Sequence, residues 1–178
     1  DDVSQMINEE LEIVSEWCFA NKQILNTNKC KAMVVYRTPL SLCQPVKISI
    51  VESLRILGVT LSSKLSWDAH IEDICTIASR RFYLLRCMKN LVDRNELHQI
   101  YESAVRTILE YCSPVFVHLN KKLSMKIERI DRRAHYIIYE DSERSCNCSG
   151  SLEARRVKAA SRLFMQAELF KDHLLHQK

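Results

Sequence analysis

Only two glycines, Gly58 and Gly150, occur in the 178 residues of this chain. Glycine lets a backbone adopt left-handed conformations and approach a ligand closely. Phosphate-binding loops, dinucleotide fingerprints and nucleophile elbows each need glycine at several fixed positions. The sequence therefore excludes these enzyme classes. Its 47% apolar and 27% charged residues predict one or two folded domains with a sizeable core.

Most of the chain is predicted to be helical, because apolar residues recur three or four positions apart over long stretches. In the third of the predicted helices, Asp93 is followed three residues later by Glu96, which predicts a capping box. Ser113-Pro114 ends that helix. Ser151 is predicted to cap the last one. The predicted helices cover residues 3–20, 67–91, 93–112, 120–139 and 151–170.

Three short runs of β-branched and apolar residues, 32–36, 46–51 and 55–61, are predicted to be strands. Their brief connections favour one small antiparallel sheet. The predicted fold is α+β and mostly α. It has one helix, then the three-stranded sheet, then a bundle of three to four amphipathic helices. We expect domain boundaries that separate residues 1–63, 64–139 and 140–178.

Charge is distributed unevenly along the chain. Residues 1–79 carry 7 Lys and Arg against 10 Asp and Glu, whereas residues 80–178 carry 19 against 12. A basic half of this kind indicates an anionic partner. A solvated surface that keeps the protein soluble explains the same charge equally well.

The basic residues of two predicted helices fall on one side of each helix. At about 100° per residue, the cations of 120–139 lie within one arc beside the apolar stripe and end at an aromatic residue. Such a ridge suits successive phosphates and a stacked base; an ordinary solvated face with i,i+4 partners is the alternative. The candidate nucleic-acid-binding residues are Arg80, Lys122, Lys126, Arg129, Arg133, Tyr136, Arg155, Lys158 and Arg162.

Neither the cysteines nor the histidines form a recognisable metal or catalytic motif. The eight cysteines are interpreted as reduced, buried small hydrophobic residues of an intracellular protein. Cys146 and Cys148 lack zinc-finger spacing, and no histidine pair has the spacing of a helical zinc motif. We therefore expect no metal site. No apolar run is long enough for a membrane span and no targeting signal is found, so we expect a nuclear or cytoplasmic protein without membrane contact.

Several linked strings resemble the region downstream of the catalytic loop in reverse transcriptases of non-LTR (LINE-like) retrotransposons. The resemblance extends over nearly the whole chain in order and spacing. After Trp17 and Asn26, it consists of KCKAM at 29–33, LRILGVTL at 54–61, KLSWDAHI at 64–71, YLLR at 83–86, LEYCSPVF at 109–116 and IDRRAHYII at 130–138. Phe116 stands where the family usually has Trp.

This resemblance implies an RNA-directed DNA polymerase in which palm carboxylates bind two Mg²⁺ ions and thumb helices hold the template–primer duplex. Residues 1–63 then correspond to the end of the palm, 64–139 to the thumb, and 140–178 to a polar loop with a helical extension. Lys29 and Lys31 fall in the motif whose lysine is thought to help protonate the leaving pyrophosphate. Residues Leu57, Gly58 and Val59 fall in the hairpin that supports the primer end.

The family's catalytic aspartates lie in a Tyr-x-Asp-Asp loop that is followed by a strand. Here Asp1 and Asp2 lead directly into residues with helical periodicity, so we interpret them as the polar start of the first helix. Two-metal nucleotidyl transfer needs carboxylates that hold both ions. We therefore expect no catalytic residue and no Mg²⁺ site in this chain, which alone should not polymerise.

Two functions of different class remain open. In the first, the chain is a fragment of a larger polymerase, as its start at Asp1 without Met suggests, and it binds an RNA/DNA hybrid or another duplex together with the rest of the parent polymerase. In the second, it is a decayed or co-opted helical interaction module without nucleic-acid binding. An isolated palm remnant would also expose apolar residues such as Val34 and Ile48, which predicts self-association.

Overall fold

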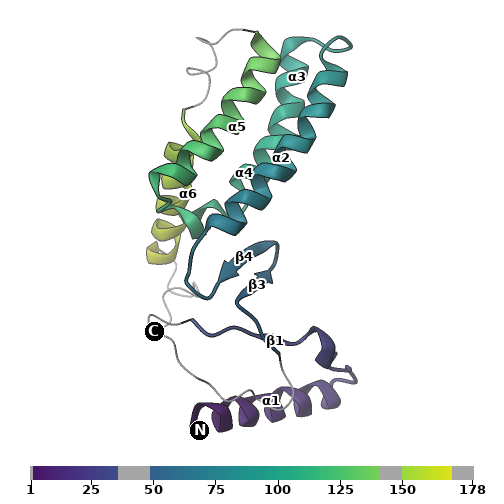
Figure 1. Cartoon of the computed structure of the whole chain (residues 1–178), viewed down its shortest axis with the longest axis vertical. Helices are drawn as coiled ribbons and strands as arrows, with labels where there is room; N and C mark the ends of the chain where they lie inside the picture. The colour runs from purple at the N-terminus through teal and green to yellow at the C-terminus, as the bar shows by residue number, and fades with distance from the viewer. Residues whose placement is uncertain (1, 36–48, 141–149, 170–178) are drawn as a thin grey trace. The chain divides into compact units, whose positions relative to one another are not determined.

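The computed structural model describes residues 2–35, 49–140 and 150–169. The fold is α+β and mostly helical, as predicted from the sequence. The chain divides into two compact units: a first unit, Asp1–Ser66, and a helical unit, Trp67–Lys178. The first unit contains one helix and the short strands, and the helical unit contains the rest of the helices (Figure 1).

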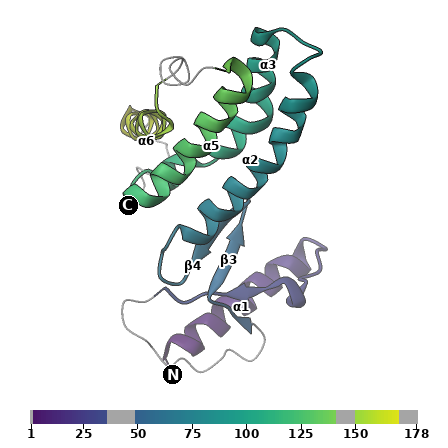
Figure 2. The same cartoon turned by 45° about the horizontal axis from the view of Figure 1, so that its top comes forward.

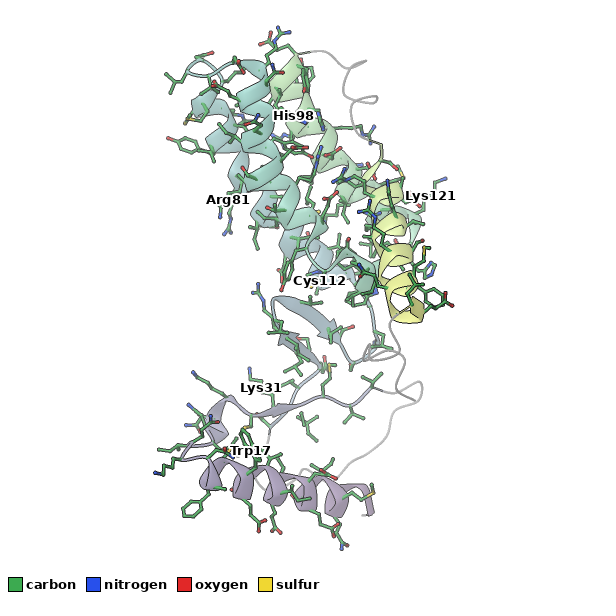
Figure 3. The ribbon with its side chains drawn as sticks, turned by 180° about the vertical axis from the view of Figure 1, so that it is seen from behind. Trp17, Lys31, Arg81, His98, Cys112 and Lys121 are labelled. Carbon is green, nitrogen blue, oxygen red and sulfur yellow. The ribbon has the colours of Figure 1, made fainter. Side chains whose placement is uncertain are left out.

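Helix α1 (Asp2–Ala20) opens the first unit, in agreement with the predicted helix. Because the helix already includes Asp2, this residue is the start of a helix rather than part of a strand-flanked loop; Asp1 lies outside the described residues. Trp17, labelled in Figure 3, is exposed along with several other apolar side chains of α1. Val34 is half-buried, so water-exposed apolar surface lies on α1 rather than at Val34, and Ile48 lies outside the described residues.

The predicted three-stranded antiparallel sheet is wrong. In the described residues there are two separate two-stranded ladders. After a 3₁₀ turn, η1 (Thr27–Lys29), strand β1 (Lys31–Ala32) pairs in parallel with β2 (Ser49–Ile50). Strand β3 (Ser53–Ile56) pairs with β4 (Val59–Ser62) in an antiparallel hairpin. Residues 36 and 46–48, which belong to the predicted strands, lie outside the described part.

The run 55–61 is a hairpin and not one strand because its centre turns back. Ile56 pairs with Val59, and the two residues between them, Leu57 and Gly58, have φ values of 47° and 85°. Two successive residues with positive φ make the tight turn whose twist matches that of paired antiparallel strands. The hairpin that the resemblance implies at Leu57, Gly58 and Val59 is therefore present in the fold.

The helical unit is formed by amphipathic helices, as expected. Helices α2, α3 and α5 run side by side, and α6 packs beside α5 (Figures 1 and 2). The predicted helix 93–112 is interrupted and ends earlier than expected. The elements are α2 (Asp68–Met88), α3 (Arg94–Tyr101), the π-helical segment η2 (Glu102–Arg106), α4 (Thr107–Glu110), the 3₁₀ turn η3 (Ser113–Phe116), α5 (Lys121–Tyr139) and α6 (Leu152–Leu169).

Side-chain caps fix where three of these helices begin. The backbone N–H of Glu96 donates to the Asp93 carboxylate at 2.7 Å, and the Asp93 N–H donates back to Glu96 at 3.1 Å. This confirms the predicted capping box. The Asn120 side chain accepts from the Leu123 N–H at 2.9 Å, and the Ser151 hydroxyl accepts from the Ala154 N–H at 3.1 Å. These bonds satisfy donors that a helix start would otherwise leave unpaired.

The π-helical segment η2 interrupts a regular pattern of core residues. Leu97, Tyr101, Val105 and Leu109 are all buried and all four residues apart. On an uninterrupted α-helix each four-residue step turns a side chain by about 40°, so the fourth would lie about 120° from the first. The i→i+5 turn of η2 removes this drift. All four side chains consequently reach the same core.

The core of the helical unit combines apolar side chains with a buried polar cluster. Phe116 is fully buried against Trp67 and His70, with ring centroids 6.0 and 5.4 Å away. Elsewhere, the Tyr101 hydroxyl donates to Asp131. His135 contacts both: its ring centroid lies 4.9 Å from that of Tyr101, and its Nε2 lies 3.7 Å from an Asp131 oxygen. We refer to the polar cluster formed by His98, Tyr101, Glu102, Arg106, Asp131, His135 and Tyr139 as the buried histidine cluster.

The five cysteines in the described residues are not joined in disulfides, but the expectation that they are buried is wrong for four of these five. Only Cys75 is buried, and the Cys87 side chain is exposed. Burial raises the pKa of the Cys75 thiol, although the nearby Lys126 charge opposes this. Cys43, Cys146 and Cys148 lie outside the described residues.

Candidate nucleic-acid interface

Helix α5 presents its basic residues on the side opposite its buried side. Leu123, Ile127 and Ala134 are buried in the core. At about 100° per residue, the predicted ridge occupies an arc of about 80° on the other side of the helix. Lys122, Arg129, Arg133 and Tyr136 are exposed and Lys126 is half-exposed. The structure thus places this group of predicted residues along one surface.

Two cations at the C-terminal end of α2 lie beside this ridge. A pocket of about 840 Å³ is lined by Arg86 of α2 and by Lys89, which follows the last residue of that helix, together with Arg133, Tyr136, Ile137 and Glu140. Figures 1 and 2 show α2 and α5 next to each other along their lengths. We call this surface the α2–α5 face; its members are Arg86, Lys89, Lys122, Lys126, Arg129, Arg133 and Tyr136.

Acidic side chains neutralise part of the α2–α5 face. The Lys126 ammonium lies 2.9 Å from Glu72, which raises the pKa of Lys126. Lys89 lies 2.6 Å from Glu140 and lowers the pKa of that carboxyl. Exposed ion pairs of this kind contribute little free energy, so a polyanion can compete for these lysines.

The other cations of the face remain available to an anionic partner. Within the described part of the chain, Arg86, Lys122 and Arg129 have no ion-pair partner. The Arg133 guanidinium lies 5.5 Å from the centroid of the Phe82 ring, a cation–π contact that holds its stem against α2. Six cations of the face stand against Glu72, Glu140 and the nearby Asp68, so the face keeps a positive charge.

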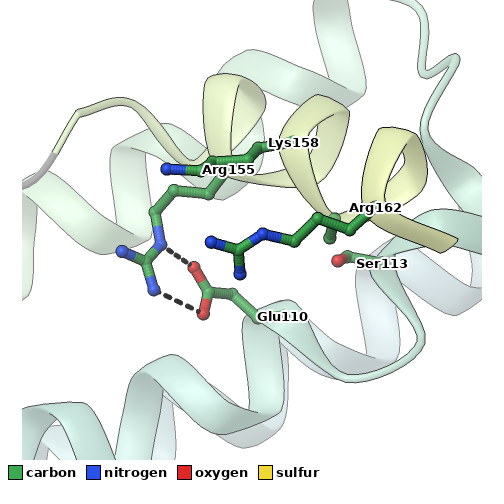
Figure 4. Close-up of a pocket in the computed structure, with 6 residues that line it drawn as sticks. Glu110, Ser113, Arg155, Lys158 and Arg162 are labelled. Carbon is green, nitrogen blue, oxygen red and sulfur yellow. Dashed lines mark hydrogen bonds and ion pairs between the residues drawn. The ribbon is translucent and has the colours of Figure 1, made fainter. Parts of the chain in front are cut away.

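A second group of predicted residues lies at a different place, where α4, η3 and α6 meet (Figure 4). The Arg155 guanidinium donates two hydrogen bonds to the carboxylate of Glu110. One runs from Nε to Oε1, and the other runs from Nη2 to Oε2 at 3.1 Å. The carboxylate raises the pKa of Arg155. The surrounding hollow has a volume of about 320 Å³. We call it the α6 pocket; Glu110, Ser113, Arg155, Lys158, Ala159 and Arg162 line it.

The remaining predicted residues lie outside both surfaces. Arg80 is exposed on α2, about 120° around the helix from Arg86, so it is not part of the α2–α5 face. In the first unit, Lys29 ends η1 and Lys31 begins β1, and both are exposed (Figure 3). Leu57 and Gly58 are exposed at the hairpin turn, whereas Val59 is buried.

Sequence reasoning missed Arg86, Lys89 and the glutamates that pair with the ridge. The three-residue spacing of Arg86 and Lys89 is a signal that could have placed them on one side of α2. No comparable signal exists for the pairs Lys126–Glu72 and Arg155–Glu110, whose partners are 54 and 45 residues apart. Such pairs depend on how the helices pack, which a single sequence does not encode locally.

Within the described residues, no group of three or more His, Cys, Asp or Glu is arranged to hold a metal ion. None of the described helices combines the length and the apolar character needed to cross a membrane.

Comparison of the chain with protein-family models, curated proteins and solved structures found no match.

Proposed function

We propose that the helical unit binds duplex nucleic acid through the α2–α5 face, without reading its sequence, and that the chain is the thumb-containing part of a non-LTR retrotransposon reverse transcriptase. The observation that carries the proposal is the cationic α2–α5 face with the exposed Tyr136 at its end. The linked motifs described above support the family and an RNA/DNA hybrid as the duplex.

The spacing of the α5 cations suits a phosphate backbone. Lys122, Lys126, Arg129 and Arg133 are three or four residues apart, so successive charges are about 5 to 6 Å apart along the helix axis. Together they span roughly 16 Å. One strand of a duplex carries a phosphate about every 3.4 Å along its axis, so the ridge can reach about four or five phosphates.

Contacts of this kind position a duplex and carry no sequence information. Lysine and arginine neutralise phosphates and release counterions, and an exposed tyrosine provides a surface on which a terminal base can stack. The chemistry of nucleotide transfer is assigned to the parent polymerase. Its Mg²⁺ ions and catalytic carboxylates are part of this proposal and lie outside the described residues.

Binding is tested by fluorescence anisotropy with a labelled RNA/DNA hybrid across a salt series. For four or five neutralised phosphates, the logarithm of the binding constant should fall against the logarithm of salt concentration with a slope of about −4. The triple variant Lys126→Gln, Arg129→Gln, Arg133→Gln should weaken binding at least about tenfold and make that slope shallower by about 2 to 3.

The matched control removes three exposed cations from the first unit: Lys22→Gln, Arg55→Gln and Lys64→Gln. It loses the same net charge but leaves the α2–α5 face intact, so its affinity should stay close to that of the unmodified chain. Equal losses in both triple variants would show only a general charge effect. Salt-independent binding, or no binding, would reject the proposal in favour of the helical interaction module.

The polymerase assignment has its own test. The polypeptide from which the chain derives is expected to carry, upstream of Asp1, a Tyr-x-Asp-Asp loop between two strands. A parent without that loop contradicts the assignment even where duplex binding is found.

A further inference from the structure

We propose that the α6 pocket is a second anion site, separate from the α2–α5 face, and that it takes a phosphate group. The inference stands on the geometry of Glu110, Ser113, Arg155, Lys158 and Arg162 and does not require the α2–α5 face to bind a duplex.

Charge within the α6 pocket is unbalanced in favour of an anion. Three cations face one carboxylate, and the two-pronged Arg155–Glu110 pair neutralises that carboxylate. Within the described residues, Lys158 and Arg162 have no ion-pair partner. The pocket thus keeps two positive charges, which match the charge of a phosphate dianion.

The donor side chains line the same hollow. Figure 4 shows the Arg162 side chain extending from α6 toward Glu110, with Ser113 on the opposite wall. Ser113 is only 4% exposed and lines the pocket. A planar guanidinium, an ammonium and a hydroxyl supply the charge-assisted hydrogen bonds that phosphate oxygens accept.

The Arg155–Glu110 pair has a structural role in this arrangement. It ties α6 to the end of α4, so the backbone that carries Lys158 and Arg162 is held beside Ser113. The buried Arg156, whose Nη2 donates to the Ser124 hydroxyl at 2.9 Å, fixes the same turn of α6 to α5. A site held on rigid helices needs little ordering when its ligand arrives.

Volume and lining define the ligand class. About 320 Å³ is enough for a phosphate with part of an attached sugar. No aromatic side chain lines the pocket within the described residues, so no surface for base stacking is present there. The chemistry recognised is therefore the phosphate group, whether it is free or attached to a nucleotide.

The α6 pocket and the α2–α5 face lie on different sides of α5. Helix α6 joins α5 through Ser124 and Glu128, which contact Glu153 at 3.3 and 2.9 Å. On a helical projection these two residues lie more than 80° from every cation of the α5 ridge. A ligand in the pocket can therefore be distinguished from one on the ridge by which residues it contacts.

The test is an NMR titration of the ¹⁵N-labelled full chain with inorganic phosphate, with sodium chloride adjusted to hold ionic strength constant. Saturable shifts are expected for amides near Glu110, Ser113 and Arg155–Arg162. Arg162→Gln should weaken phosphate binding at least about tenfold, as expected for loss of a charged hydrogen bond. Arg129→Gln, the matched control on the α2–α5 face, should leave it unchanged.

The source of the phosphate is resolved with three further ligands: a 5′-phosphorylated dinucleotide, the same dinucleotide with a 5′-hydroxyl, and sulfate. Tighter binding of the phosphorylated dinucleotide identifies a terminal phosphate; equal binding of both dinucleotides identifies a backbone diester. Binding of inorganic phosphate alone identifies the free ion. Shifts that never saturate, that sulfate reproduces in full, or that persist in Arg162→Gln overturn the proposal, whatever the outcome at the α2–α5 face.

Discussion

His135 lies at the centre of the buried histidine cluster and is 2% exposed. Its ring stacks on Tyr139 with an interplanar angle of 9°, and its Nδ1 has no hydrogen-bond partner within the described residues. Burial lowers the pKa of His135, since the charged form loses its hydration; the nearby Asp131 carboxylate opposes this shift. The ionisable groups around it are Asp131, Arg106, Glu102 and His98.

The folded state is therefore expected to lose stability in mild acid. Below the ordinary histidine pKa of about 6.5, the unfolded chain takes up a proton that folded His135 resists. The free energy of unfolding should then fall as pH decreases from 7 to 5, with His135 contributing at most about 1.4 kcal/mol per pH unit. Urea unfolding at each pH measures this slope.

His135→Gln should flatten the pH dependence, and His118→Gln, at an exposed position, should leave it as it is. Parallel curves for the unmodified protein and His135→Gln between pH 7 and 5 would contradict the assignment of this proton to His135.

Residue types alone predict the capped positions better than the buried polar ones. Asp93 and Ser151 could be recognised as caps because a cap bonds to a backbone N–H three residues away. Arg156 could not be recognised as buried, although it is 1% exposed. The residues that flank it in the sequence do not distinguish it from Arg155. The two arginines differ in burial only because of how α6 packs on α5.

At the scale of elements, the β3–β4 hairpin contains an uncommon turn residue. Leu57 has a φ of 47° and is 84% exposed. A residue with a Cβ costs about 1 kcal/mol or more in the left-handed region, and asparagine tolerates it better than leucine. The hairpin is therefore less stable than one with the same strand pairing and a residue suited to positive φ at position 57.

Leu57→Asn should stabilise the β3–β4 hairpin by about 0.5 to 1 kcal/mol, because asparagine followed by glycine is the preferred pair for this turn. Amide hydrogen exchange of β3 and β4 should slow several-fold. Leu57→Ala serves as the control, since it also removes the exposed leucine but keeps the unfavourable φ. Equal exchange rates in the two variants would show that strain at Leu57 is not what limits the hairpin.

The elements of the helical unit follow from periodicity much more closely than the strands do. Helices of 18 to 21 residues give several turns of consistent spacing, as in α2 and α6. Strands of two to four residues give at most two alternations, so the run 55–61 could be read as one strand or as two. Gly58 is the residue in this run that favours a turn and hence two strands, whereas leucine at position 57 does not indicate a turn.

At the scale of the whole molecule, the exposed apolar residues of α1 have a consequence for the isolated chain. Met6, Ile13 and Trp17 are 58 to 60% exposed and lie within an arc of about 40° on the helix. Contiguous apolar surface in contact with water favours association. In a pure sample, we expect a second copy of the same chain to cover this apolar surface of α1.

Light scattering after size exclusion should therefore show a mass that increases with concentration above that of a 20.8 kDa monomer. The double variant Ile13→Gln, Trp17→Gln should shift the equilibrium toward monomer. A double change of exposed apolar residues elsewhere, Leu91→Gln with Leu169→Gln, is the control and should leave association unaltered. A monomer at high concentration in the unmodified chain would contradict the prediction.

The i→i+5 turn of η2 also affects how the helical unit tolerates changes in chain length. Because this turn accommodates one residue more than a regular α-helix, loss of exposed Ser103 would leave an ordinary helix in which Tyr101 and Leu109 still face inward. Helix α5 contains no such extra residue, so a deletion in its middle would rotate every later side chain by about 100°. Single-residue deletions should therefore be accepted in one helix of this bundle and rejected in its neighbour.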